Sequence, residues 1–164
     1  MIDLICAFRQ DDHSIRLNQE FQLDLAWWQE LFHSWEGLSF FLTPNWAPFP
    51  DFHVSSNAAG ALGYGAIFND HWFFRSWTES QHLLSIAYKE LFPIVVAAHV
   101  WGSQWVTRRI EFLSDNELVV AVLKSGTSKH CNLMVLLRYL TQLAVRHLFS
   151  FTASSVQGDR KSVV

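Results

Sequence analysis

The sequence predicts an α/β fold, in which helices pack on a mixed five-stranded sheet in the order β-β-β-α-β-α-α-β. Three observations support this prediction. Residues 51–77 contain three short apolar or aromatic runs separated by turn residues, a pattern typical of an antiparallel meander. Two later runs, 108–113 and 149–156, have the length and composition of short strands. The segments between these runs repeat apolar residues with the period of a helix.

Composition limits the class of protein and its compartment. The 164 residues suffice for a domain with a substantial core, half of them are hydrophobic, and 8 are Trp and 14 are Phe. The net charge of −3 does not by itself indicate a nucleic-acid binder. Cys6 and Cys131 form no CxxC pair, so we expect a reducing, intracellular location, cytoplasmic or nuclear. Neither a signal peptide nor an apolar run of ~18 residues is evident, so no membrane partner is expected.

Residues 1–50 are predicted to form a connector that contains an amphipathic helix. Asn18 is a suitable N-cap, and Gly37 is a suitable end for a helix that reaches about Trp35. Residues 1–8 and 38–42 are candidate strands, and Pro44, Pro48 and Pro50 indicate an extended loop. The helix carries one aromatic stripe, which we expect to cover one side of the sheet: Phe21, Leu25, Trp28, Phe32 and Trp35.

The predicted meander carries three glycines and one polar residue of interest. Gly60, Gly63 and Gly65 allow sharp turns and a close approach of neighbouring backbone. Asn57 lies near the end of the first strand, where a side chain can point into a site. The alternative is that Asn57 is a turn residue.

Helices account for most of the second half. Residues 78–84 are predicted to form a loop, followed by a helix over 85–105, in which Pro93 either makes a kink or marks the first turn. A short helix is expected over 117–124, and a longer one over 130–148.

Four groups of residues together resemble a known family. Residues 57–66, Asn-Ala-Ala-Gly-Ala-Leu-Gly-Tyr-Gly-Ala, resemble the Asp-Ala-Ser-Gly-x-x-Gly-x-Gly-Ala signature of the ribonuclease H domain of retrotransposon reverse transcriptases, of the DIRS type or related. The supporting groups are 86–95, 113–120 and 136–138, in the family's order and spacing. The resemblance runs from about residue 15 to the C-terminus. It implies the ribonuclease H fold over 51–164 and hydrolysis of the RNA strand of an RNA–DNA hybrid.

The resemblance assigns Asn57, Glu90 and Asp115 as catalytic and metal-binding residues. The family's chemistry uses carboxylates that hold two Mg²⁺ ions, or Mn²⁺ in their place. Glu90 has apolar helix neighbours, which suits a buried site residue. The alternatives for Glu90 are a partly exposed position or an ion pair with Lys89. For Asp115 the alternative is the capping box of residues 114–117, with Ser114 as the cap, although both can hold together.

Three departures from the family pattern predict a degenerate copy. The family's first Asp is Asn57 here, and its Ser is Ala59. The family's fourth acidic residue would fall one position beyond Val164, so we expect the domain to lack its C-terminal segment. Asp159 is out of register for that role. Little or no activity is therefore expected.

Basic residues in the second half are candidates for substrate binding: Arg108, Lys124, Lys129 and Arg138. They could line a path for a hybrid's phosphates, and the alternative is a solvated polar face. The partners expected from the resemblance are an RNA–DNA hybrid or other nucleic acid and a polymerase domain of the same polyprotein. Two other functions stay open: a non-catalytic nucleic-acid- or protein-binding module on the same fold, and a nuclease of the integrase or transposase kind. The eight scattered His residues do not indicate a zinc site.

Overall fold

The computed structural model describes residues 16–34 and 50–156 of the chain. The chain forms two compact units, Met1–Ser39 and Phe40–Val164. The strands expected at 1–8 and 38–42, most of the proline-rich loop, and Asp159 with the rest of the C-terminal segment lie outside the described residues.

The first unit contains one described helix, α2, over Gln19–Ser34. Asn18 caps it as predicted, because its side-chain oxygen accepts a hydrogen bond of 2.8 Å from the Phe21 N–H. Two ring contacts run along the predicted aromatic stripe. Trp28 meets Trp27 edge-on at 5.0 Å and stacks on Phe32 at 5.5 Å between ring centroids. The role of this stripe as a cover for the sheet stays a prediction.

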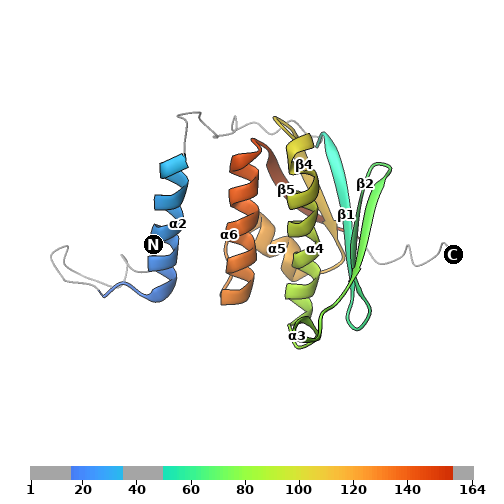
Figure 1. Ribbon diagram of the computed structural model, residues 1–164, viewed down its shortest axis with the longest axis horizontal. Coiled ribbons are helices and arrows are strands. Elements are labelled where there is room, and N and C mark those ends of the chain that lie inside the picture. The colour runs from blue at the N-terminus through green and yellow to red at the C-terminus, as the bar shows by residue number, and fades with distance from the viewer. Residues whose placement is uncertain (1–15, 35–49, 157–164) are drawn as a thin grey trace. The chain divides into compact units, whose positions relative to one another are not determined.

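The second unit contains the predicted mixed sheet (Figure 1). Its strands lie in the order β3-β2-β1-β4-β5. They are β1 (Phe52–Ala59), β2 (Gly63–Phe68), β3 (His71–Ser76), β4 (Arg109–Ser114) and β5 (Ser150–Ser155). The first three form the expected antiparallel meander, whereas β4 runs parallel to β1 and β5 runs parallel to β4. The carboxyl ends of β1 and β4 therefore lie at the same end of the sheet.

Two of the three meander glycines lie where backbone approaches closely. A Cβ on Gly63 would lie 2.2 Å from the Arg75 carbonyl oxygen, and one on Gly65 would lie 2.7 Å from the Phe73 carbonyl oxygen. A Cβ on Gly60 would meet nothing within 4 Å. The predicted close approach of backbone is thus confirmed at Gly63 and Gly65. Gly60 lies in the turn after β1, and there its carbonyl oxygen accepts a hydrogen bond from Lys89.

The helices of the second unit follow the sequence prediction with two corrections. They are α3 (Glu79–His82), α4 (Ile86–Trp101), η1 (Gly102–Gln104), α5 (Glu117–Ser125) and α6 (Cys131–Arg146). The first correction is α3, which occupies the predicted loop and begins with a capping box of Thr78 and Gln81. The second is the end of α4, which lies at Trp101, where a 3₁₀ turn takes over. Pro93 lies inside the helix, so it does not mark the first turn. Within the described residues, no helix is long and apolar enough to cross a membrane.

The cap of α5 also differs from the prediction. Asn116 is the N-cap, and its side-chain oxygen accepts hydrogen bonds from the N–H groups of Leu118 and Val119 at 3.0 and 3.3 Å. Ser114 is buried, and its hydroxyl instead accepts a bond of 3.2 Å from the Asn116 N–H. Asp115 therefore lies between the end of β4 and the N-cap of α5, and it takes no part in the cap. Gly126, with φ of 68°, ends the helix.

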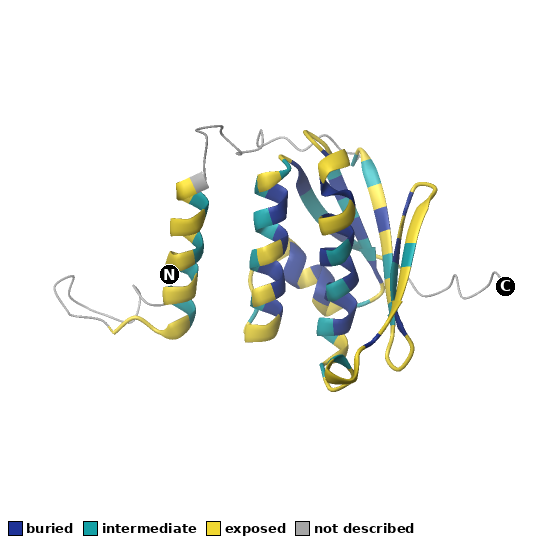
Figure 2. Cartoon of the chain, viewed as in Figure 1, coloured by how far each residue is buried: buried dark blue, intermediate teal, exposed yellow. Residues whose placement is uncertain are grey.

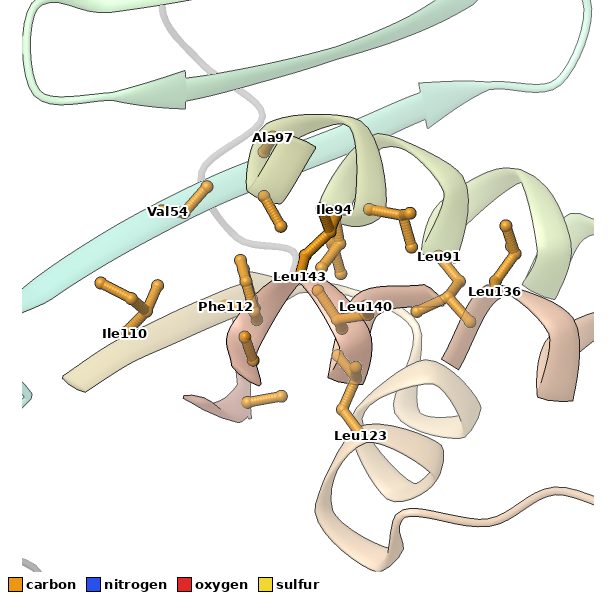
Figure 3. Close-up of a cluster of buried hydrophobic side chains, with 14 of the residues drawn as sticks. Val54, Leu91, Ile94, Ala97, Ile110, Phe112, Leu123, Leu136, Leu140 and Leu143 are labelled. Atoms are coloured by element: carbon orange, nitrogen blue, oxygen red, sulfur yellow. The ribbon is translucent and has the colours of Figure 1, made fainter. Parts of the chain in front are cut away.

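Helices α4, α5 and α6 contribute to one hydrophobic core with a single face of the sheet. Figure 3 shows Ile94 of α4, Phe112 of β4, Leu123 of α5 and Leu140 of α6 converging in one cluster. Buried residues concentrate on the sides of α4 and α6 that face each other and the sheet (Figure 2). Burial of this apolar area is the main stabilising term of the fold.

The other face of the sheet carries exposed apolar side chains. Along β1, Val54 points into the core, while the alternate residues His53, Ser55 and Asn57 are exposed. Strand pairing places Ile67, Trp72 and Phe74 on the same side as Ser55 and Asn57. The exposed fractions of these three side chains are 57%, 73% and 56%. We call this surface the open face.

The close approach at Gly63 predicts a sharp contrast between two glycine substitutions. Gly63→Ala should lower the free energy of unfolding by about 2 kcal/mol or more, because the added methyl group collides with the Arg75 backbone. Gly60→Ala is the matched control and should stay within about 0.5 kcal/mol of the parent protein. Urea unfolding of the three proteins measures both values. Equal effects would show that β2 and β3 adjust freely around Gly63.

The open face predicts binding of a hydrophobic dye. Replacing both Trp72 and Phe74 with Ser should remove the dye fluorescence that arises from the open face, because these rings supply much of the apolar surface there. Leu83→Ser is the control, since Leu83 is 91% exposed and follows α3, outside the open face. If the double variant binds as much dye as the Leu83→Ser protein, the dye binds to apolar surface outside the open face.

Candidate functional site

The candidate site lies where β1 and β4 separate. Their parallel pairing extends to Ser55 and Leu113. Beyond this point β1 continues in its pairing with β2, whereas β4 ends at Ser114 and the chain turns into α5. Separation of two parallel strands exposes backbone and side chains at their carboxyl ends, which is where open α/β sheets bind ligands.

Asn57 and Asp115 line one cleft on the open face. The cleft has a volume of about 650 Å³, and its lining also includes Ser55, Gly65 and Leu113. Asn57 pairs with Gly65 within β1, so it is a strand residue and the turn alternative is wrong. Both Asn57 and Asp115 are exposed, and their side chains are therefore accessible to a ligand in the cleft.

Glu90 reaches the same region from the opposite side of the sheet. It lies on α4 with only 7% of its surface exposed, so the partly exposed alternative is wrong. Its carboxylate accepts a hydrogen bond from the backbone N–H of Ala58, the residue after Asn57. Its Oε2 atom is buried and has no hydrogen-bond partner. No ion pair joins it to Lys89, whose ammonium donates instead to two backbone carbonyls.

Two causes raise the pKa of Glu90 to about 7. The larger is burial, which penalises the charged carboxylate, and the second is the negative charge of Asp115. The Ala58 hydrogen bond acts in the opposite direction. The effect of Asp115 on this pKa places Asp115 within electrostatic range of the Glu90 carboxylate. The structure thus brings together Asn57, Glu90 and Asp115 from β1, α4 and the end of β4.

These residues fit a divalent cation of the hard type. Carboxylate and amide oxygens are the ligands that Mg²⁺ and Mn²⁺ prefer. A buried carboxylate oxygen without a partner is costly, and a bound cation would satisfy it. Among residues 16–34 and 50–156, no three or more His, Cys, Asp or Glu side chains gather as metal ligands. With two carboxylates, the site balances the charge of one divalent ion rather than two.

The four basic residues expected to bind substrate do not line the cleft. Arg108 precedes β4, at the opposite end from Asp115, and its guanidinium lies 5.8 Å from the centre of the Phe52 ring. Lys124 and Lys129 are exposed in the last turn of α5 and just before α6, and Arg138 lies within α6. Their contact with nucleic acid stays a prediction.

Sequence reasoning missed two residues beside the site. Lys89 and Trp77 are both buried and bind the backbone of the turn after β1. The available signal was a lysine within the apolar run that precedes Glu90 on its helix. Nothing in the sequence indicated which groups Lys89 would bind, because its acceptors are backbone carbonyls.

The strand order, the crossing helix and the position of the site define a ribonuclease H-like fold. Solved structures of ribonucleases H share it. The N-terminal RNase H domain of Rv2228c from Mycobacterium tuberculosis is 20% identical, with a TM-score of 0.50 over 67% of this chain and 86% of that one. RNase H1 from Halobacterium salinarum NRC-1 is 14% identical, with a TM-score of 0.51 over 66% and 86%.

A third structure, LC11-RNase H1 in complex with an RNA/DNA hybrid, is 14% identical, with a TM-score of 0.53 over 68% of this chain and 87% of that one. At these identities the similarity establishes the fold alone. No protein-family model matches the chain, and no curated protein sequence matches it.

The raised pKa of Glu90 predicts how stability depends on pH. The ordinary pKa of 4.5 applies to the unfolded chain and about 7 to the folded one, so between these values the folded protein binds more protons. Stability should therefore fall as pH rises through this range, by at most about 3 kcal/mol. In Glu90→Gln this loss should be absent.

Urea unfolding at pH 5 and pH 8 measures the difference. Glu117→Gln is the control, since Glu117 is an exposed residue in the first turn of α5 and its replacement should leave the pH dependence unchanged. A Glu90→Gln protein that loses as much stability as the parent between the two pH values would contradict the assignment of this titration to Glu90.

Proposed function

We propose that this chain is the ribonuclease H domain of a retroelement reverse transcriptase, of the DIRS type or related, with a weakened catalytic site. The observation that carries the proposal is the buried Glu90 carboxylate, which has one oxygen without a partner and a pKa raised by the charge of Asp115, a residue that lines the same cleft as Asn57. The likeness of the fold to LC11-RNase H1, solved with an RNA/DNA hybrid, supports the substrate class.

Asn57, Glu90 and Asp115 would hold a Mg²⁺ or Mn²⁺ ion. Such an ion supplies an activated water and stabilises the leaving oxygen of the phosphodiester. Glu90 would have to release its proton before it could act as a ligand, since its pKa is raised to about 7. Asp115, exposed at the cleft, would present its carboxylate to the same ion.

Asn57 weakens this site through charge. For two unit charges 4 Å apart, the Coulomb term is about 4 kcal/mol at an effective dielectric constant of 20. An amide in place of a carboxylate forgoes most of this attraction toward a cation. We therefore expect weak ion binding and little cleavage of a hybrid by the chain as it stands.

The proposed role also names partners and a location. A retroelement ribonuclease H would act beside the polymerase domain of the same polyprotein, which we propose as the protein partner. Its nucleic-acid partner would be an RNA–DNA hybrid. Reverse transcription takes place inside the cell, so the proposed location is cytoplasmic or nuclear.

The charge argument predicts opposite effects of two substitutions. Asn57→Asp should tighten Mn²⁺ binding at least tenfold, whereas Glu90→Gln should abolish it. Electron paramagnetic resonance of free Mn²⁺ measures binding, and cleavage of a labelled RNA–DNA hybrid with Mg²⁺ or Mn²⁺ measures activity. Asn57→Asp should also raise any trace of cleavage.

Two substitutions in the turn between β2 and β3 make the same charge changes outside the cleft. Asn69→Asp is the control for Asn57→Asp, and Asp70→Asn is the control for Glu90→Gln. Neither should change Mn²⁺ binding more than twofold. Robust cleavage by the unmodified chain that Glu90→Gln abolishes would show a working enzyme that tolerates Asn57. Binding of the hybrid without Mn²⁺ binding in any variant would favour the non-catalytic module.

A further inference from the structure

Lys89 occupies an unusual position beside the candidate site. It precedes Glu90 on α4 and is buried, with 6% of its surface exposed. Its Nζ donates hydrogen bonds to the carbonyl oxygens of Gly60 at 2.8 Å and His82 at 3.0 Å. The same ammonium lies 5.8 Å from the centre of the Trp77 ring. A buried ammonium is tolerated only when such partners replace its water.

Trp77 binds the adjacent carbonyl of the same turn. Its indole N–H donates to the Ala59 carbonyl oxygen at 2.9 Å, and its ring lies 4.6 Å from the ring of Tyr64. Two buried side chains, from α4 and from the end of β3, thus hold the consecutive carbonyls of Ala59 and Gly60. These carbonyls lie at the end of β1 and the start of the turn that leads to β2, and residues 60–62 of this turn are exposed.

We propose that Lys89 and Trp77 are positioning residues, which hold the start of this turn so that the Ala58 N–H stays on the Glu90 carboxylate and Asn57 stays at the cleft. Ala58 directly precedes the first anchored carbonyl, and Asn57 precedes Ala58. Lys89 and Glu90 are consecutive on one helix, so the anchor and the carboxylate move as one body. The value of this arrangement for ion binding rests on the proposed function.

The structure also explains why an apolar side chain would not serve as well. An apolar residue at position 89 would fill the space, but it would leave the carbonyls of Gly60 and His82 without their donor. The turn would then be free to move away from α4. The Ala58 N–H would move with it, because one peptide unit separates it from the anchored Ala59 carbonyl.

The test uses two variants of the full chain without metal or nucleic acid. Lys89→Met removes the donor to Gly60, and Trp77→Phe removes the donor to Ala59 without changing any charge. The readout is the amide proton shift and hydrogen exchange of Ala58, measured by NMR at pH 8, which lies above the pKa of Glu90. Glu90→Gln gives the shift of an Ala58 amide that has lost its charged acceptor.

In both variants, the Ala58 shift should move more than halfway to its value in Glu90→Gln. Exchange at Ala58 should accelerate at least tenfold relative to exchange at Val54, which lies in the core part of β1. Phe149→Leu is the stability control, because Phe149 is buried at the opposite end of β5 and its truncation loosens the fold away from the site. It should leave the Ala58 shift unchanged.

An unchanged Ala58 shift in both folded variants would overturn the proposal and leave Lys89 and Trp77 as ordinary stabilising residues. Trp77→Phe keeps the test decisive if Lys89→Met does not fold. Mn²⁺ binding is a second measurement. The double variant Asn57→Asp/Lys89→Met should bind Mn²⁺ at least tenfold more weakly than Asn57→Asp alone. Failure of every variant to bind Mn²⁺ would overturn the proposed function, while the Ala58 signal still decides the positioning role.

Discussion

The candidate site depends on one constraint: the buried Glu90 carboxylate has fewer polar partners than its two oxygens need. A buried carboxylate needs hydrogen bonds, a proton or a cation, and Glu90 has the Ala58 N–H on the carboxylate and no partner for Oε2. Because its pKa is about 7, a proton would compete near neutral pH with the cation of the proposed function. A salt bridge from Lys89 would have ended this competition, but Lys89 is engaged by two carbonyls.

The fold creates this situation through the separation of β1 and β4. As long as the two strands pair, backbone bonds fill the space between them, and this pairing ends at Ser55 and Leu113. Past that point, a side chain from α4 can approach the backbone of Ala58 from the core side, while Asn57 and Asp115 approach the same region from the open face. Residues from both faces of one sheet can therefore form a single site.

Periodicity and turn chemistry in the sequence were sufficient to predict the strands, α4, α5 and α6. They failed where two local signals competed. Ser and Asn both cap helices well, so Ser114 and Asn116 were both candidates. Asn116 is the cap of α5 because Ser114 still belongs to β4. The apolar pattern continues to Trp105, but the helix ends at Trp101. Trp105 follows a 3₁₀ turn, and from this position its side chain is still buried in the core. The single turn of α3 is too short for periodicity to reveal.

For the site, resemblance supplied Asn57, Glu90 and Asp115, but not their energetics, which depend on how deeply α4 buries Glu90. Those energetics mean that an amide rather than a carboxylate at position 57 also affects the stability of the metal-free protein. A third carboxylate here would raise the pKa of Glu90 further and destabilise the metal-free protein, because like charges would crowd a buried group. The same carboxylate would strengthen ion binding. In the proposed function, Asn57 would therefore lower the affinity of the site for an ion and would spare the metal-free fold this destabilisation.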